Sequence, residues 1–163
     1  MPQPGDIGLT KIGGVLGWFV YLGQCLIGDR SKWTHAFVVL HNDMLIEAQP
    51  GGALLFPLDK YKNRDVVFVA PEELTQEQRD AIVAEATMLQ GTPYSYADYV
   101  ALFLELLGIR SKFLRKYVRT SGRLICSQLV DESYRRGGFH LFDDGRLPMD
   151  ITPGDLARRF NVR

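Results

Sequence analysis

The stretch AFVVLHNDMLIEAQ, residues 36–49, decides the expected fold. Residues 36–40 form a solid apolar run rich in β-branched side chains, which predicts a buried strand. Residues 44–49 predict the next strand. Residues 41–43, His-Asn-Asp, predict a compact turn between them, because Asn and Asp tolerate the left-handed backbone. The stretch therefore predicts an antiparallel hairpin.

Further strands are expected on both sides of this hairpin. Residues 5–10 predict a short strand entered from a turn, and residues 50–52, Pro-Gly-Gly, predict a second turn. Residues 53–56 and 66–70 are apolar runs that predict two more strands. The order of short strands and turns indicates an antiparallel meander, not alternating βαβ units.

Helices are expected in the second half of the chain. Thr75 and Gln78 have capping-box spacing, and Thr152 followed by Pro153 is a typical helix start. The first predicted helix begins after Thr75 and ends at Gly91 and Pro93. Further helices are predicted over residues 99–107, over residues 126–136 with Gly137-Gly138 after them, and from residue 153. Residues 110–123 are expected to form a basic connector.

Composition indicates one ordinary globular domain over residues 1–163. Apolar residues make up 46% and charged residues 23% of the chain, which is typical of a folded domain. The net charge is zero, so no global attraction to nucleic acid is expected. Two cysteines do not make a disulfide framework, and Pro2, Pro4 and Asp6 do not suit a signal peptide. We expect a cytoplasmic protein.

Two local stretches leave alternatives open. Residues 12–27 are apolar and uncharged; we favour a buried or substrate-side helix, with a weak membrane-surface contact as the alternative, since a span needs about 20 residues. Residues 110–119 are basic and suit either a solvated helix face or attraction to an acidic substrate or lipid headgroups.

Cys126 is the strongest candidate nucleophile. It stands at the predicted start of a helix, where the helix dipole lowers the pKa of a thiol and backbone N–H groups can bind an oxyanion. The alternative is a small buried side chain, which is what most free cysteines are.

His35 and Glu47 are candidate partners for this thiol. His35 stands at the entry to a predicted strand and could act as general base. Glu47 is a charge inside an apolar strand, where burial requires a partner. With a three-residue turn, Phe37 lies opposite Glu47 and His35 is its diagonal neighbour on the same face; a two-residue turn would separate them. A strand-end histidine and a solvent-facing glutamate are the alternatives.

Other reactive side chains carry less weight. Cys25 lies in the apolar segment and is expected to pack in the core; His41 is expected in a turn, and His140 in a separate late segment. The three histidines lack the close spacing of a zinc site, and no phosphate-binding glycine loop is present. We therefore expect no metal and no cofactor.

These motifs resemble the NlpC-type cell-wall peptidase superfamily, which has a papain-like fold. The similar segments are Gly91-Thr92-Pro93-Tyr94, Ile125-Cys126-Ser127, Gly5-Asp6-Ile7, Trp33-Thr34-His35 with the strand that follows, and Ile46-Glu47-Ala48. Their two halves stand in swapped order, as in the circularly permuted branch that contains YiiX-like amidases and lecithin:retinol-acyltransferase-like proteins. Residues 151–156 resemble the YiiX-like group in particular.

The resemblance implies an α+β papain-like fold in which an antiparallel sheet packs against the nucleophile helix. It implies a cysteine hydrolase with Cys126 as nucleophile, His35 as base and Glu47 as the orienting third residue. Tyr94 would line the site, and Ser127 and Trp33 from the same motifs would contact substrate.

The implied substrate is a peptide, isopeptide, peptidoglycan fragment or lipid amide. Two other functions are compatible with the same residues. One is a lipid acyltransferase or thioesterase, in which a lipid amine or hydroxyl accepts the acyl group. The other is a binding module that kept the fold without activity.

Overall fold

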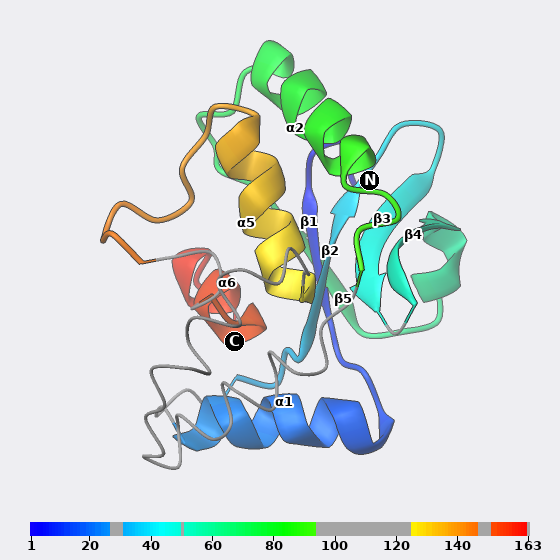
Figure 1. Cartoon of the computed structure of the whole chain (residues 1–163), viewed down its shortest axis with the longest axis vertical. Helices are drawn as coiled ribbons and strands as arrows, with labels where there is room; N and C mark the ends of the chain where they lie inside the picture. Colours follow the sequence, from blue (N-terminus) through cyan, green and yellow to red (C-terminus); the bar gives the residue numbers. More distant parts are fainter. Residues whose placement is uncertain (27–30, 50, 94–124, 147–150, 163) are drawn as a thin grey trace.

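The computed structural model describes residues 1–26, 31–49, 51–93, 125–146 and 151–162 (Figure 1). Among these, five strands form one sheet and helices pack against it, so the fold class is α+β. The strands are β1 (Ile7–Thr10), β2 (His35–Val39), β3 (Met44–Gln49), β4 (Gly52–Pro57) and β5 (Val66–Val69). The helices are α1 (Gly14–Leu26), the single 3₁₀ turn η1 (Leu58–Tyr61), α2 (Gln76–Met88), α5 (Cys126–Arg136) and α6 (Pro153–Arg159).

The β2–β3 hairpin has the register that a three-residue turn requires. The Leu40 N–H donates to the Met44 carbonyl at 2.8 Å, and Val38 pairs with Ile46. Asn42 and Asp43 have φ angles of 57° and 52°, the left-handed conformation expected of these residue types. One further step along this register places Phe37 opposite Glu47, so the predicted hairpin is confirmed.

The meander prediction is right for β2, β3 and β4 and wrong for β5. The sheet order is β4-β3-β2-β1-β5, all antiparallel, so β5 pairs with β1 and not with β4. All four residues of β1 are buried, and buried backbone N–H and C=O groups need partners on both edges of the strand. At β4, Ala53 instead exchanges two backbone hydrogen bonds with Gly91 and Thr92.

The two faces of the sheet carry different clusters. On one face, α5 packs against β2 and β3, and α2 packs against α5 (Figure 1). Side chains of this main cluster include Ile7, Leu9, Val38, Ile46, Ile82, Leu129, Val130, Tyr134 and Leu156. On the other face, Phe37, Val39 and Leu45 pack with Tyr61 of η1. This division follows from the alternation of side chains along a strand.

The predicted helix ends are found where they fall on described residues. Thr75 and Thr152 each form both hydrogen bonds of a capping box. The helix predicted over residues 126–136 is α5, and Gly138 follows it with a φ of 82°. The helix predicted over residues 99–107 and the connector 110–123 lie outside the described residues.

Residues 12–27 contain α1, as predicted, but this helix is not buried on all sides. Val20 and Gln24 are buried, whereas Trp18 and Tyr21 are exposed. Within the described ranges, every helix is either too short or too polar to cross a bilayer.

Gly8→Ala tests the packing between β1 and β2. Gly8 pairs with Phe37, and a Cβ atom at Gly8 would lie 2.1 Å from the Phe37 ring. That ring is held in a stack with Tyr61, at 4.8 Å between centroids. We expect the substitution to lower the free energy of unfolding by about 1–3 kcal/mol in urea denaturation. Gly13→Ala is the control, since a Cβ there meets nothing within 4 Å; equal stability of the two variants would contradict the packing argument.

Candidate active site

Cys126, His35 and Glu47 come from three elements that meet at one end of the sheet. Cys126 is the first residue of α5, His35 is the first residue of β2, and Glu47 lies within β3. Helix α5 packs on β2 and β3 (Figure 1), and this brings its N-terminal residue to the strand that begins with His35. All three side chains are buried, with exposed fractions of 1% for Cys126, 4% for His35 and 1% for Glu47.

The His35 imidazole lies between the thiol and the carboxylate. Its Nε2 is 2.5 Å from Oε2 of Glu47, and the ring also forms a hydrogen bond with the Cys126 side chain. A carboxylate on one ring nitrogen fixes the orientation of the ring toward a partner on the other.

Glu47 has two further partners, both from η1. Lys60 donates to Oε1, and the Tyr61 hydroxyl donates to Oε2 at 2.5 Å. The expectation that a buried Glu47 must have a partner is therefore confirmed, and three donors surround its two oxygens. Sequence patterns did not single out Lys60 or Tyr61. Two facts could have pointed to them. A buried carboxylate needs several donors, and both residues come shortly after β4, the strand that pairs with β3.

The pKa values of His35, Glu47 and Tyr61 are shifted by burial and by their contacts with one another. Burial, the largest influence on His35, lowers its pKa, but the hydrogen bonds and charges of Cys126 and Glu47 raise the pKa from 6.5 to about 9. Burial likewise raises the pKa of Glu47, but His35, Lys60 and Tyr61 together bring the pKa from 4.5 down to about 2. At neutral pH the site thus holds an imidazolium beside a carboxylate. Burial and the bond to Glu47 raise the pKa of Tyr61 far above its ordinary value, so its hydroxyl stays a proton donor.

The N-terminus of α5 supplies a positive electrostatic end to the site. Ile125 precedes the helix in extended conformation, and its N–H donates to the Gln128 side chain at 2.9 Å. Leu129 is the donor of the first bond of the helix, to the Ile125 carbonyl at 3.0 Å. Cys126 therefore stands in the first turn, where the helix dipole favours an anionic sulfur.

Ser127 and Trp33 are both buried, and their contact with substrate stays a prediction. Ser127 is fully buried, and its hydroxyl donates to the Ile151 carbonyl at 2.5 Å. This bond joins α5 to the segment before α6. Trp33 is 1% exposed and belongs to the main cluster. Tyr94, the third predicted substrate contact, lies outside the described residues.

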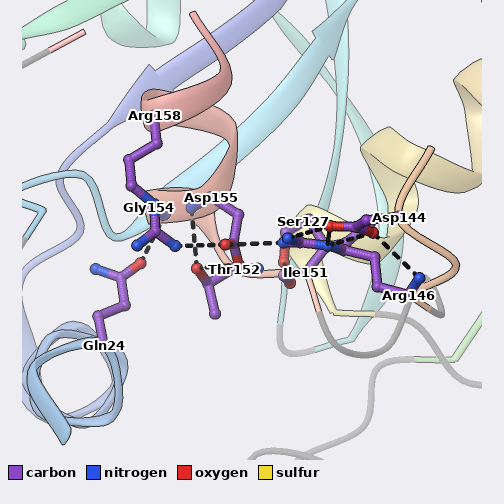
Figure 2. A network of polar contacts seen from close by, with 9 residues as sticks. All are labelled: Gln24, Ser127, Asp144, Arg146, Ile151, Thr152, Gly154, Asp155 and Arg158. Carbon is purple, nitrogen blue, oxygen red and sulfur yellow. Dashed lines mark hydrogen bonds and ion pairs between the residues drawn. The ribbon is translucent and has the colours of Figure 1, made fainter. Parts of the chain in front are cut away.

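A polar network holds the segment that leads into His35. Gln24 of α1 donates to the Trp33 carbonyl at 3.0 Å and accepts from the Gly154 N–H at 2.9 Å. Figure 2 shows how this contact continues through α6 to Asp155, which accepts bonds from Thr152, Arg146 and Arg158. Sequence patterns missed Gln24, although a lone polar side chain in an apolar helix indicates a specific partner.

His41 and Cys25 lie in other elements than the three site residues. His41 is in the β2–β3 turn, as expected, with its Nε2 3.6 Å from Asp80. Cys25 lies in α1 and is half-buried, so the expectation that it packs in the core is wrong. Among the described residues, His, Cys, Asp and Glu side chains do not gather in a group of three or more that could hold a metal ion.

Glu47→Gln tests the electrostatics of the site. Removal of the carboxylate charge leaves the Lys60 ammonium and the His35 imidazolium without their shared counter-ion. We expect the pKa of His35 to fall by about one unit or more in an NMR titration and the free energy of unfolding to fall by about 3–5 kcal/mol. Glu72→Gln, at an exposed position, is the control. An unchanged pKa of His35 would mean that Glu47 does not govern this imidazole.

Comparison with known proteins adds no assignment: no family model matches the chain, and no curated protein matches it.

Proposed function

We propose that this protein is a cysteine hydrolase that cleaves an amide bond through an acyl-enzyme on Cys126. The observation that carries the proposal is the line Cys126–His35–Glu47, in which one imidazole bonds both a thiol at a helix N-terminus and a buried carboxylate. A nucleophile, a base and a group that orients the base are the parts that nucleophilic catalysis requires.

The reaction would proceed in two halves. Cys126 Sγ attacks the carbonyl carbon, the oxyanion rests at the N-terminal end of α5, and the C–N bond breaks as the His35 imidazolium gives its proton to the leaving amine. Water then attacks the thioester and loses a proton to His35. The C–S bond breaks, the carboxylic acid leaves, and the thiolate–imidazolium pair is restored.

The charge state of His35 supports this order of events. A pKa of about 9 keeps the imidazole protonated at neutral pH, and an imidazolium stabilises a neighbouring thiolate. With its pKa near 2, Glu47 stays anionic over the same range. The resting site would therefore hold a reactive thiolate together with the proton that the leaving amine needs.

The order of the elements supports a permuted papain-like fold for this chemistry. The strands that carry His35 and Glu47 come before α5 in the chain, and α5 packs on these strands. In the family that the motifs resemble, the same elements occur in the opposite order in the standard branch. The substrate class that follows from the resemblance is a peptide, isopeptide, muropeptide or lipid amide.

Access to the sulfur is a requirement that the proposal must meet. Cys126 is 1% exposed, so a substrate carbonyl can reach Sγ only after the site opens locally. Loop and lid motions gate access to many active sites, and small reagents are therefore the first choice for testing the reactivity of Cys126.

One observation favours acyl transfer to a lipid as a second candidate. Helix α1 contains no charged residue, and it exposes the aromatic rings of Trp18 and Tyr21, residue types that suit a membrane interface. Co-sedimentation with phosphatidylglycerol vesicles, together with partition of the acyl group between water and an added amine, separates this candidate from a hydrolase.

Alkylation of Cys126 tests the proposed thiolate. In a Cys25→Ser background, Cys126 is the sole thiol of the chain. We expect iodoacetamide to alkylate it at pH 6 about tenfold faster or more than in the His35→Ala variant, because the imidazolium holds the sulfur ionised. As pH rises through about 9, His35 loses its proton; the thiolate loses its counter-ion, becomes more basic, and the rate rises again.

Acylation is followed in the same background. Incubation with p-nitrophenyl acetate should add one acetyl group to Cys126, seen by intact mass spectrometry, and turnover should be lost in Cys126→Ala. A Cys126 that reacts no faster than an ordinary thiol at pH 6, with no step near pH 9, would favour the inactive binding module.

A further inference from the structure

The 3₁₀ turn η1 is fixed against the hairpin that carries the site. It follows β4 directly at Pro57, and the Leu58 N–H donates to the Asp43 carbonyl in the β2–β3 turn at 2.8 Å. Its last two residues, Lys60 and Tyr61, both reach Glu47. The backbone thus anchors η1 at one end while its side chains contact the site at the other.

Tyr61 is held by packing. Its ring stacks on Phe37 with an interplanar angle of 8°, and Phe68 makes a T-shaped contact with that same Phe37 ring. Phe37 in turn lies over Gly8, where a Cβ would collide with the ring. The stacked Tyr61 ring therefore has little freedom to move, and it holds its hydroxyl in position to donate to Oε2 of Glu47.

Lys60 is held by a cation–π contact and by the carboxylate. Its ammonium lies 3.5 Å from the centroid of the Phe56 ring and donates to Oε1 of Glu47, and its side chain is only 28% exposed. A lysine whose ammonium was simply solvated would need neither the contact with the Phe56 ring nor the hydrogen bond to Glu47. Here one cation occupies Oε1, so that Oε2 is the oxygen left for the imidazole.

We infer that Lys60 and Tyr61 are positioning residues that hold the Glu47 carboxylate ionised and turned toward His35. The inference rests on the proposed function and extends it to two residues that do not touch substrate. A carboxylate at 1% exposure must have its acceptor sites filled. His35 from β2 and Lys60 and Tyr61 from η1 are its polar partners among the described residues.

Two further ionisable groups lie near the partners of the Glu47 carboxylate. The Cys126 side chain of α5 forms a hydrogen bond with His35, and the Arg64 guanidinium lies 5.5 Å from the centroid of the Tyr61 ring. Lys60 is therefore the cation in direct contact with the carboxylate besides the imidazolium. Its removal should make Glu47 easier to protonate, and a neutral Glu47 cannot support the imidazolium.

Lys60→Met tests the inference, because methionine keeps the apolar stem beside Phe56 and removes the charge. In a plot of the Cys126 alkylation rate against pH, the rate falls at low pH as the thiolate is protonated; we call this part of the plot the acid limb. We expect the acid limb to move to higher pH by about one unit or more. Tyr61→Phe, which keeps the ring stack, should move it in the same direction by less, since it removes one hydrogen bond to the carboxylate but no charge. Lys60→Arg keeps a cation and should move the limb by less than half as much as Lys60→Met.

Lys62→Met is the matched control, since Lys62 is an exposed lysine two residues further on. A purely structural role for Lys60 would lower thermal stability and leave the pH limb in place. The inference is overturned if Lys60→Met leaves the limb where it is, or if Lys62→Met moves it equally.

A second measurement does not depend on activity. In a Cys126→Ala background, ¹³C NMR of labelled glutamate side chains follows the Glu47 carboxyl directly, and its pKa should be higher by about one unit or more with Lys60→Met than without it. If Cys126 proves unreactive but this pKa rises, the proposed function fails and the role of Lys60 stands. If the thiol is reactive and the pKa does not change, the role of Lys60 fails alone.

Discussion

The burial of the Glu47 carboxylate is the constraint on which the site depends. Removing an ionised carboxylate from water costs several kcal/mol unless partners replace the lost hydration. Glu47 obtains these partners from two places, the first residue of β2 and the end of η1. The hairpin register, the position of η1 and the orientation of His35 are therefore coupled, since a change in one leaves a buried charge without a donor.

Side chains alternate between the two faces of the sheet along each strand, so that the main cluster lies on one face and the cluster around η1 on the other. In β2, Ala36 and Val38 face α5 and α2 in the main cluster, whereas Phe37 and Val39 face η1. His35 stands at the end of this strand, where α5 begins. A residue in this position can contact both the helix on one side and the carboxylate supported from the other, and an imidazole with two nitrogens is suited to bridge them.

Local patterns were sufficient to predict much of this arrangement. The β2–β3 hairpin was predicted, but its sequence was compatible with a two- or a three-residue turn, and the three-residue register found in the structure is the one that puts Glu47 near His35. The helix that starts at Cys126 was predicted with the bounds that α5 has. The place of β5 could not be predicted from β5 itself, because it depends on the unfilled edge of β1, far away in the chain. Lys60 and Tyr61 were missed for a similar reason. Each is ordinary in its local sequence, and its role arises only when η1 folds back toward Asp43.

The backbone bonds between Ala53 and the Gly91–Thr92 segment have a consequence for association between molecules. They occupy the outer side of β4 where the strand starts, and Gly52 leaves room for them, since a Cβ there would lie 2.9 Å from the Thr92 oxygen. An open strand edge is a template on which a second chain can add a strand and begin aggregation. Residues Gly91 and Thr92, which follow α2, thus block strand addition at this part of the β4 edge. The absence of a side chain at Gly52 lets them approach the strand closely.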